Sequence, residues 1–85
     1  MEAYILSFRR GGGGQKEWYA ILEIPSVNTA GKAAAFIGRK VVWKPKEDKV
    51  FTGRIVRTHG RRGRLLARFK KPLPGQAIGS KVKIL

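Results

Sequence analysis

The sequence predicts a small, mainly β protein: a closed antiparallel barrel that carries one short helix. Short runs alternate apolar with polar side chains, which is the period of a strand with one buried and one solvated face. Turns rich in glycine and proline separate these runs, and a single alanine-rich segment has the composition of a helix. At 85 residues, with no internal repeat or linker visible, the chain is expected to fold as one domain.

The clearest element is a hairpin with arms at residues 50–58 and 64–70 and a turn at 59–63. Gly60 and Gly63 allow the positive φ angles that a tight or bulged turn needs. With Leu66 as the exception, the second arm alternates: Leu65, Ala67 and Phe69 are expected on one face, and Arg64, Arg68 and Lys70 on the other.

Two strands are expected before the hairpin, at residues 3–8 and 18–24. In the first, Tyr4, Leu6 and Phe8 are predicted to share a face. The second is apolar on both faces, so it is expected to lie centrally or under a neighbouring element. Trp18 and Tyr19 are candidate platforms for stacked bases, although a place in the core is the preferred interpretation for Trp18.

A short helix is predicted between an N-cap at Asn28 or Thr29 and a C′ residue at Gly38. An isolated helix of this length is marginal, so Phe36 and Ile37 are expected to dock it onto the sheet as a lid over one end of the barrel. Further strands are predicted at 39–44, with Val41 and Trp43 on one face, and at 81–85, with Val82 and Ile84 on one face.

The charge is the strongest compositional signal. Nineteen Lys and Arg oppose five Asp and Glu, giving a net charge of +14, and no acid follows Asp48. Solubility alone needs a far smaller net charge of mixed sign. A chain this basic repels itself unless a polyanion offsets the charge, and nucleic acid is the commonest such partner.

Catalytic chemistry is hard to assemble from these residues. There is no cysteine, and His59 is the sole histidine, so neither a triad nor a three-ligand metal site is expected. Glu47 and Asp48 stand between lysines and are interpreted as solvated charge. The glycines at 11–14 lack the ending of a P-loop; they are interpreted as a flexible loop or one that settles against phosphates. No enzyme activity, cofactor or metal is predicted.

Residues 53–85 resemble the C-terminal signature of the L35Ae family of large-subunit ribosomal proteins. The matching positions are Gly53, Arg57, His59, Gly60, Gly63, Ala67, Phe69, Leu73, Pro74, Ala77, Ile78 and Gly79. Toward the N-terminus, Arg9-Arg10-Gly11 with Gln15, and residues 36–40, resemble the family more loosely.

The resemblance implies a six-stranded antiparallel barrel akin to the second domain of translation elongation factors. It implies a structural role on the cytoplasmic ribosome, against ribosomal RNA of the large subunit and neighbouring ribosomal proteins. The short loop at 45–49 suggests an archaeal-type member. Without a signal peptide or a transmembrane run, the chain is expected to be soluble and intracellular, with no membrane partner, and a monomer when isolated.

The predicted RNA-binding residues are the basic side chains of the hairpin, with a second group outside it: Arg57, Arg61, Arg62, Arg64, Arg68, Lys70 and Lys71, then Arg9, Arg10 and Lys40. They would neutralise phosphates and release counterions. For His59 two interpretations stay open, a contact with phosphate or base and a structural cap of the hairpin. Three alternatives remain: a freestanding module that binds transfer RNA, a small basic chromatin protein, and a nuclease that depends on His59.

Overall fold

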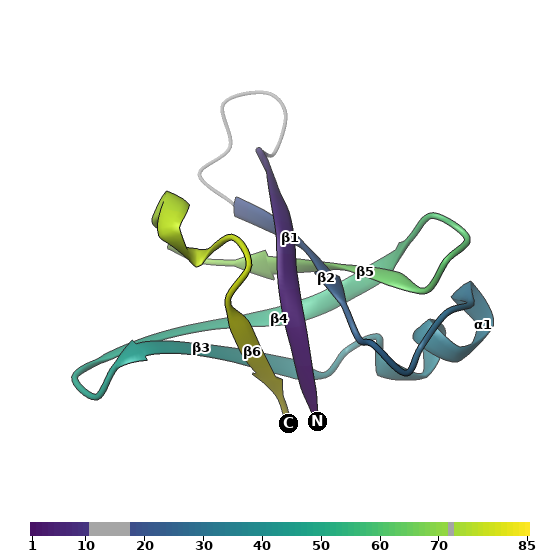
Figure 1. Cartoon of the computed structure of the whole chain (residues 1–85), viewed down its shortest axis with the longest axis horizontal. Coiled ribbons are helices and arrows are strands. Elements are labelled where there is room, and N and C mark those ends of the chain that lie inside the picture. Colours follow the sequence, from purple (N-terminus) through teal and green to yellow (C-terminus); the bar gives the residue numbers. More distant parts are fainter. Residues whose placement is uncertain (11–17, 72) are drawn as a thin grey trace.

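The computed structural model describes residues 1–10, 18–71 and 73–85 (Figure 1). The predicted loop at 11–14, with Gln15, lies outside the described residues, as does Pro72. The strands form a closed antiparallel barrel in the order β1-β2-β5-β4-β3-β6, which confirms the predicted fold class. Their bounds are β1 (Glu2–Arg10), β2 (Trp18–Glu23), β3 (Lys40–Lys46), β4 (Lys49–His59), β5 (Arg64–Phe69) and β6 (Lys81–Ile84).

The barrel closes between the two ends of the chain. β6 pairs with β1 on one side and with β3 on the other. The backbone N–H of Ile84 donates to the carbonyl of Met1 at 2.7 Å, and the N-terminal ammonium of Met1 donates back to the Ile84 carbonyl at 3.3 Å. Figure 1 accordingly shows the N- and C-termini side by side. The hairpin β4–β5 forms as the sequence predicted, with β4 and β5 paired antiparallel.

The inward face of the hairpin forms a wall of the core. Leu65, Ala67 and Phe69 are each at most 1% exposed, and Ile55 faces them from β4. Gly53 lies opposite Phe69, where an added Cβ would come within 2.6 Å of the Arg68 carbonyl oxygen and 2.9 Å of the Phe69 ring. Glycine at this position therefore lets the Phe69 ring pack directly on the backbone of β4.

The predicted face of the first strand is wrong. Ala3 and Ile5 point into the core at 0% exposure, whereas Tyr4 is only half-buried. The pairing with β2 then shifts register between Ile5 and Ser7, so Phe8 returns to the inward face opposite Ala20 and packs against the core. A β-bulge of this kind inserts one residue and reverses the alternation beyond it.

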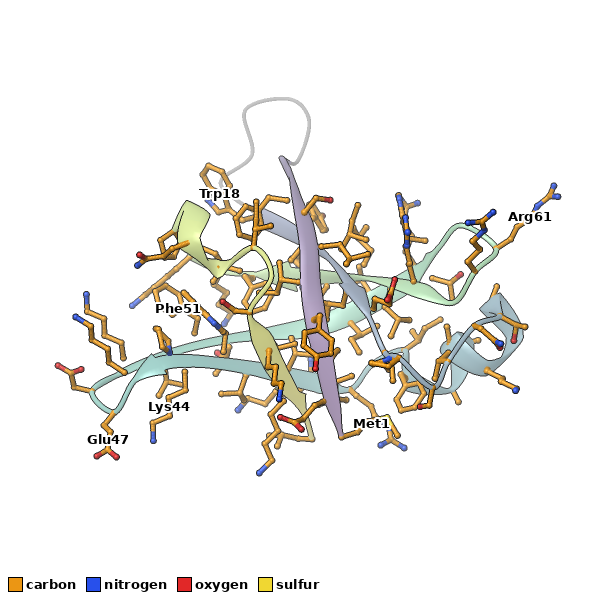
Figure 2. The ribbon with its side chains drawn as sticks, viewed as in Figure 1. Met1, Trp18, Lys44, Glu47, Phe51 and Arg61 are labelled. Carbon is orange, nitrogen blue, oxygen red and sulfur yellow. The ribbon has the colours of Figure 1, made fainter. Side chains whose placement is uncertain are left out.

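The second strand pairs with β1 and with β5, but every strand of this closed barrel has two neighbours, so the predicted central position does not distinguish it. Ala20, Leu22 and Ile24 are buried. Trp18 pairs with Phe69 but is only half-buried, so its predicted place in the core is not confirmed. It marks the end of the strand nearest the β1–β2 connection (Figure 2).

The helical segment consists of α1 (Ala30–Ala33) followed by a 3₁₀ turn, η1 (Ala34–Phe36); a second 3₁₀ turn, η2 (Gly75–Ala77), precedes β6. The hydroxyl of Thr29 caps α1 by accepting from the backbone N–H of Lys32 at 3.3 Å, and Gly38 follows with a φ of +90°. Phe36 packs against the core as predicted, but Ile37 is 45% exposed, so its predicted docking is wrong. α1 lies beside the β4–β5 turn (Figure 1).

Candidate nucleic-acid interface

Three basic residues lie side by side on the outer face of the barrel. Lys40 of β3 is directly opposite Arg54 of β4, and Arg54 is directly opposite Arg68 of β5. Directly opposed residues of antiparallel strands point to the same face, with Cα atoms about 4.5–5.5 Å apart. All three residues are exposed. We call Lys40, Arg54 and Arg68 the cationic row.

The cationic row borders a shallow depression of about 250 Å³. Lys70 and Thr52 complete its rim, and the backbone of Gly53 forms part of its floor. Of the six described residues that line it, four are basic and none is acidic. The Nη1 of Arg54 donates to the Gly38 carbonyl at 3.0 Å, which anchors one side of that guanidinium. Such a depression suits an anion with several acceptor oxygens, such as a phosphate.

The cationic row places like charges directly opposite one another. Like charges directly opposite each other on a sheet are destabilising, and no carboxylate of the described chain lines the depression. The cost is removed when a polyanion neutralises the row. The arrangement is therefore typical of a binding surface.

A second basic depression, of about 270 Å³, lies at the β4–β5 turn. It is lined by His59, Gly60, Arg61, Arg62 and Arg64. Figure 2 shows the Arg61 side chain extending away from the body of the protein at the tip of this turn. The half-buried His59 lies opposite Arg64, so the structure brings this predicted group together.

The turn is held in place by its contact with the segment before α1. Gly63 is buried and has a φ of +87°. A Cβ at this position would lie 2.7 Å from the carbonyl oxygen of Val27. In addition, the backbone N–H of Ala30 donates to the Arg61 carbonyl at 3.2 Å. These backbone contacts fix where the arginines of the turn are presented.

The surface between the two depressions is partly apolar. Leu66, the exception in the predicted alternation, is 3% exposed although it belongs to the outward-facing positions of β5. It pairs with Ile21 of β2 and with Arg57 of β4. Arg57 itself is exposed, so the two basic depressions flank a strip with one cation and a small apolar cluster.

The remaining predicted residues fall into two groups. Lys70 borders the row depression, and the exposed Lys71 follows it. Arg9 and Arg10 belong to β1, opposite Tyr19 and Trp18, but their side chains lie outside the described part of the structure. Arg54, which belongs to the row, was not predicted. A register shift between Ile55 and Arg57 turns both Arg54 and Arg57 outward, whereas strict alternation would put them on opposite faces.

Two of the described acidic side chains lie away from the cationic row. Glu23 lies with Arg64, at 3.8 Å between carboxylate and guanidinium, and both side chains are well exposed. Glu47 lies with lysines at the β3–β4 turn, at the opposite end of β4 from Arg61 (Figure 2). The β3–β4 turn therefore mixes signs, whereas the row depression does not.

Two other kinds of feature are absent from residues 1–10, 18–71 and 73–85. In these ranges, no three His, Asp or Glu side chains gather where they would hold a metal ion. Nor does any helix there have the length and apolar composition needed to cross a membrane.

Comparison with known proteins shows that this barrel belongs to the class of ribosomal proteins. The chain belongs to the ribosomal protein L35Ae family, whose pattern it matches over residues 1–85. It is a structural ribosomal protein and not an enzyme, as the sequence predicted.

Named relatives support this placement. The chain is 40% identical to the large ribosomal subunit protein eL33 of Methanopyrus kandleri, over 94% of this chain and 90% of the relative. It is 32% identical to eL33 of Aeropyrum pernix, over 95% and 86% of the two chains. Identity to eL33 of Tetrahymena thermophila is 35%, over 100% and 81%. That the chain itself is archaeal stays a prediction.

Proposed function

We propose that this chain is a constituent of the large ribosomal subunit in the cytoplasm, and that it binds ribosomal RNA through the outer face of β3, β4 and β5. The observation that carries the proposal is the cationic row, whose depression is lined by basic and neutral residues of the described chain. Family membership supports the ribosomal setting, and the charge of +14 supports a polyanionic partner. Neighbouring ribosomal proteins are further proposed partners.

The mechanism is electrostatic. Each Lys or Arg that neutralises a phosphate releases condensed counterions, so affinity falls steeply as salt rises. The cationic row supplies three such contacts, one from each of three adjacent strands. The depression at the β4–β5 turn supplies a second group of basic side chains on the same hairpin. Base edges are poorly accessible in the deep groove of an A-form helix, so backbone shape rather than base sequence is expected to dominate recognition of paired segments.

The test compares two variants in which the same number of charges is removed. K40Q/R54Q/R68Q removes the cationic row, whereas K44Q/K46Q/K49Q removes three lysines at the β3–β4 turn. Binding to transcripts that tile large-subunit ribosomal RNA is measured between 50 and 200 mM salt. If six or more phosphates are neutralised, wild-type affinity falls about a thousandfold or more over that range.

The row variant is expected to reduce the salt slope by about one for each phosphate that is no longer neutralised, up to about three. The matched turn variant should reduce it by less than about one. Equal slopes for the two variants, or a flat salt dependence of the wild type, would refute the proposed surface. Competition by transfer RNA at equal concentration tests the alternative, since a preference for transfer RNA would favour a freestanding module.

A further inference from the structure

An aromatic residue continues the cationic row on the next strand. Tyr19 of β2 is directly opposite Arg68 of β5. The position opposite Tyr19 on its other side is Arg9 of β1. In register, the outer face therefore reads lysine, arginine, arginine, tyrosine across the four adjacent strands β3, β4, β5 and β2.

The structure separates the two aromatic residues that the sequence offers as stacking platforms. Trp18 is opposite the buried Phe69 and so belongs to the inward-facing positions of β2. Tyr19 alternates to the outward face, where its opposite residue is the exposed Arg68. It is half-buried, so part of the side chain is accessible to solvent next to a phosphate-binding depression.

We propose that Tyr19 is the stacking platform for an unpaired base of the RNA, whose adjoining phosphate is held by Arg68. This inference rests on the proposed function and narrows the ligand: the preferred RNA carries a bulged or looped-out nucleotide next to a paired segment. The base and phosphate of one nucleotide are joined through a single ribose. A stacking ring and a guanidinium at neighbouring cross-strand positions are therefore suitably placed to hold both parts.

The chemistry fits this division of roles between the two side chains. Specific recognition of RNA usually uses unstacked bases that stack on aromatic side chains, and every base has a π-face that a tyrosine ring can cover. A fully paired helix offers phosphates to the cationic row but no free base to Tyr19. Duplex RNA therefore gains only part of the interaction.

The experiment uses the full chain and two RNA hairpins that differ by one bulged nucleotide in an otherwise identical stem. Tyr19→Leu removes the ring but keeps an apolar side chain on the strand, and Tyr19→Phe keeps the ring without its hydroxyl. Loss of one stacked base weakens binding by roughly 5- to 150-fold. We expect Tyr19→Leu to lose affinity for the bulged hairpin within that range and to bind the paired hairpin within about twofold of wild type.

Tyr4→Leu is the matched control. Tyr4 is likewise half-buried on the outer face, but it lies opposite Glu23 and Lys81, and the Lys81 ammonium is 5.9 Å from its ring centroid. Its replacement should leave the affinity for both hairpins within about twofold. Tyr19→Phe should retain the preference for the bulge. Thermal unfolding by circular dichroism verifies that each variant is folded.

The outcomes separate this inference from the proposed function. If the wild type binds both hairpins equally, or Tyr19→Leu weakens both to the same extent, the stacking role is overturned even though K40Q/R54Q/R68Q still lowers binding. If the row variant changes nothing, the proposed function fails as well. A 2-aminopurine placed at the bulge gives an independent readout: its fluorescence should be quenched by the wild type and by Tyr19→Phe, but not by Tyr19→Leu.

Discussion

Alanine substitutions at two glycines of the β4–β5 turn measure how closely the turn packs against the segment before α1, through their effect on the free energy of unfolding. Gly60 and Gly63 have φ angles of +79° and +87°, so alanine at either position costs about 1–2 kcal/mol for the left-handed backbone. At Gly60, no atom of the described residues lies within 4 Å of an added Cβ. At Gly63 the Cβ would also meet backbone atoms, the Val27 oxygen at 2.7 Å and the Thr29 nitrogen at 3.0 Å.

Backbone atoms cannot rotate away as a side chain can, so Gly63→Ala must shift the turn or the segment before α1. Overpacking of this kind typically costs a further 1–3 kcal/mol or so. The total is about 2–5 kcal/mol for Gly63→Ala against about 1–2 kcal/mol for Gly60→Ala. A chain of this size has a free energy of unfolding on the order of 4–13 kcal/mol. Gly63→Ala therefore removes a large share of the stability.

The assay is thermal and urea unfolding of both variants, followed by circular dichroism and tryptophan fluorescence. A difference of 1 kcal/mol lowers the Tm by roughly 4–8 °C in a domain of this length. Gly63→Ala should therefore melt at least about 4 °C below Gly60→Ala. Equal melting temperatures would refute the close contact between the turn and Val27.

Two further predictions concern the barrel wall. Gly53→Ala brings a Cβ within 2.6 Å of the Arg68 carbonyl and should cost about 1–3 kcal/mol by overpacking; an unchanged Tm would contradict the packing of Phe69 on β4. Lys40→Gln removes a like charge opposite Arg54 and should stabilise the protein without RNA by about 0.2–1 kcal/mol at low salt. That gain should vanish near 1 M salt, where screening is nearly complete, and a destabilisation at both salt concentrations would show that Lys40 has a structural role instead.

The hairpin could be predicted from the sequence because its local signals agree. The alternation through Leu65, Ala67 and Phe69 gives the inward face of β5, and all three are buried. Two glycines mark the turn, and both have positive φ angles. In such a segment, side-chain period and turn chemistry point to the same structure, and no distant part of the chain is needed to decide it.

Two of the three register shifts between the described strands could not be predicted in this way. Neither Ile5-Leu6-Ser7 nor Ile55-Val56-Arg57 contains a glycine or proline that would mark an irregularity. Each shift arises in the pairing with a neighbouring strand. The first returns Phe8 to the core, and the second places Arg54 in the cationic row. The composition of the proposed binding surface thus depends on a register that only the closed barrel defines.

The closure of the barrel has a consequence for the order of folding. Hairpin β4–β5 joins strands that are adjacent in sequence, whereas β1 finds its second partner only in β6, at the far end of the described chain. Contacts between distant segments require the loss of conformational entropy on loop closure before any favourable contact energy is gained. The basic hairpin can therefore form while the seam between β1 and β6 is still open, and its cations would then be available to the proposed RNA partner before the barrel is closed.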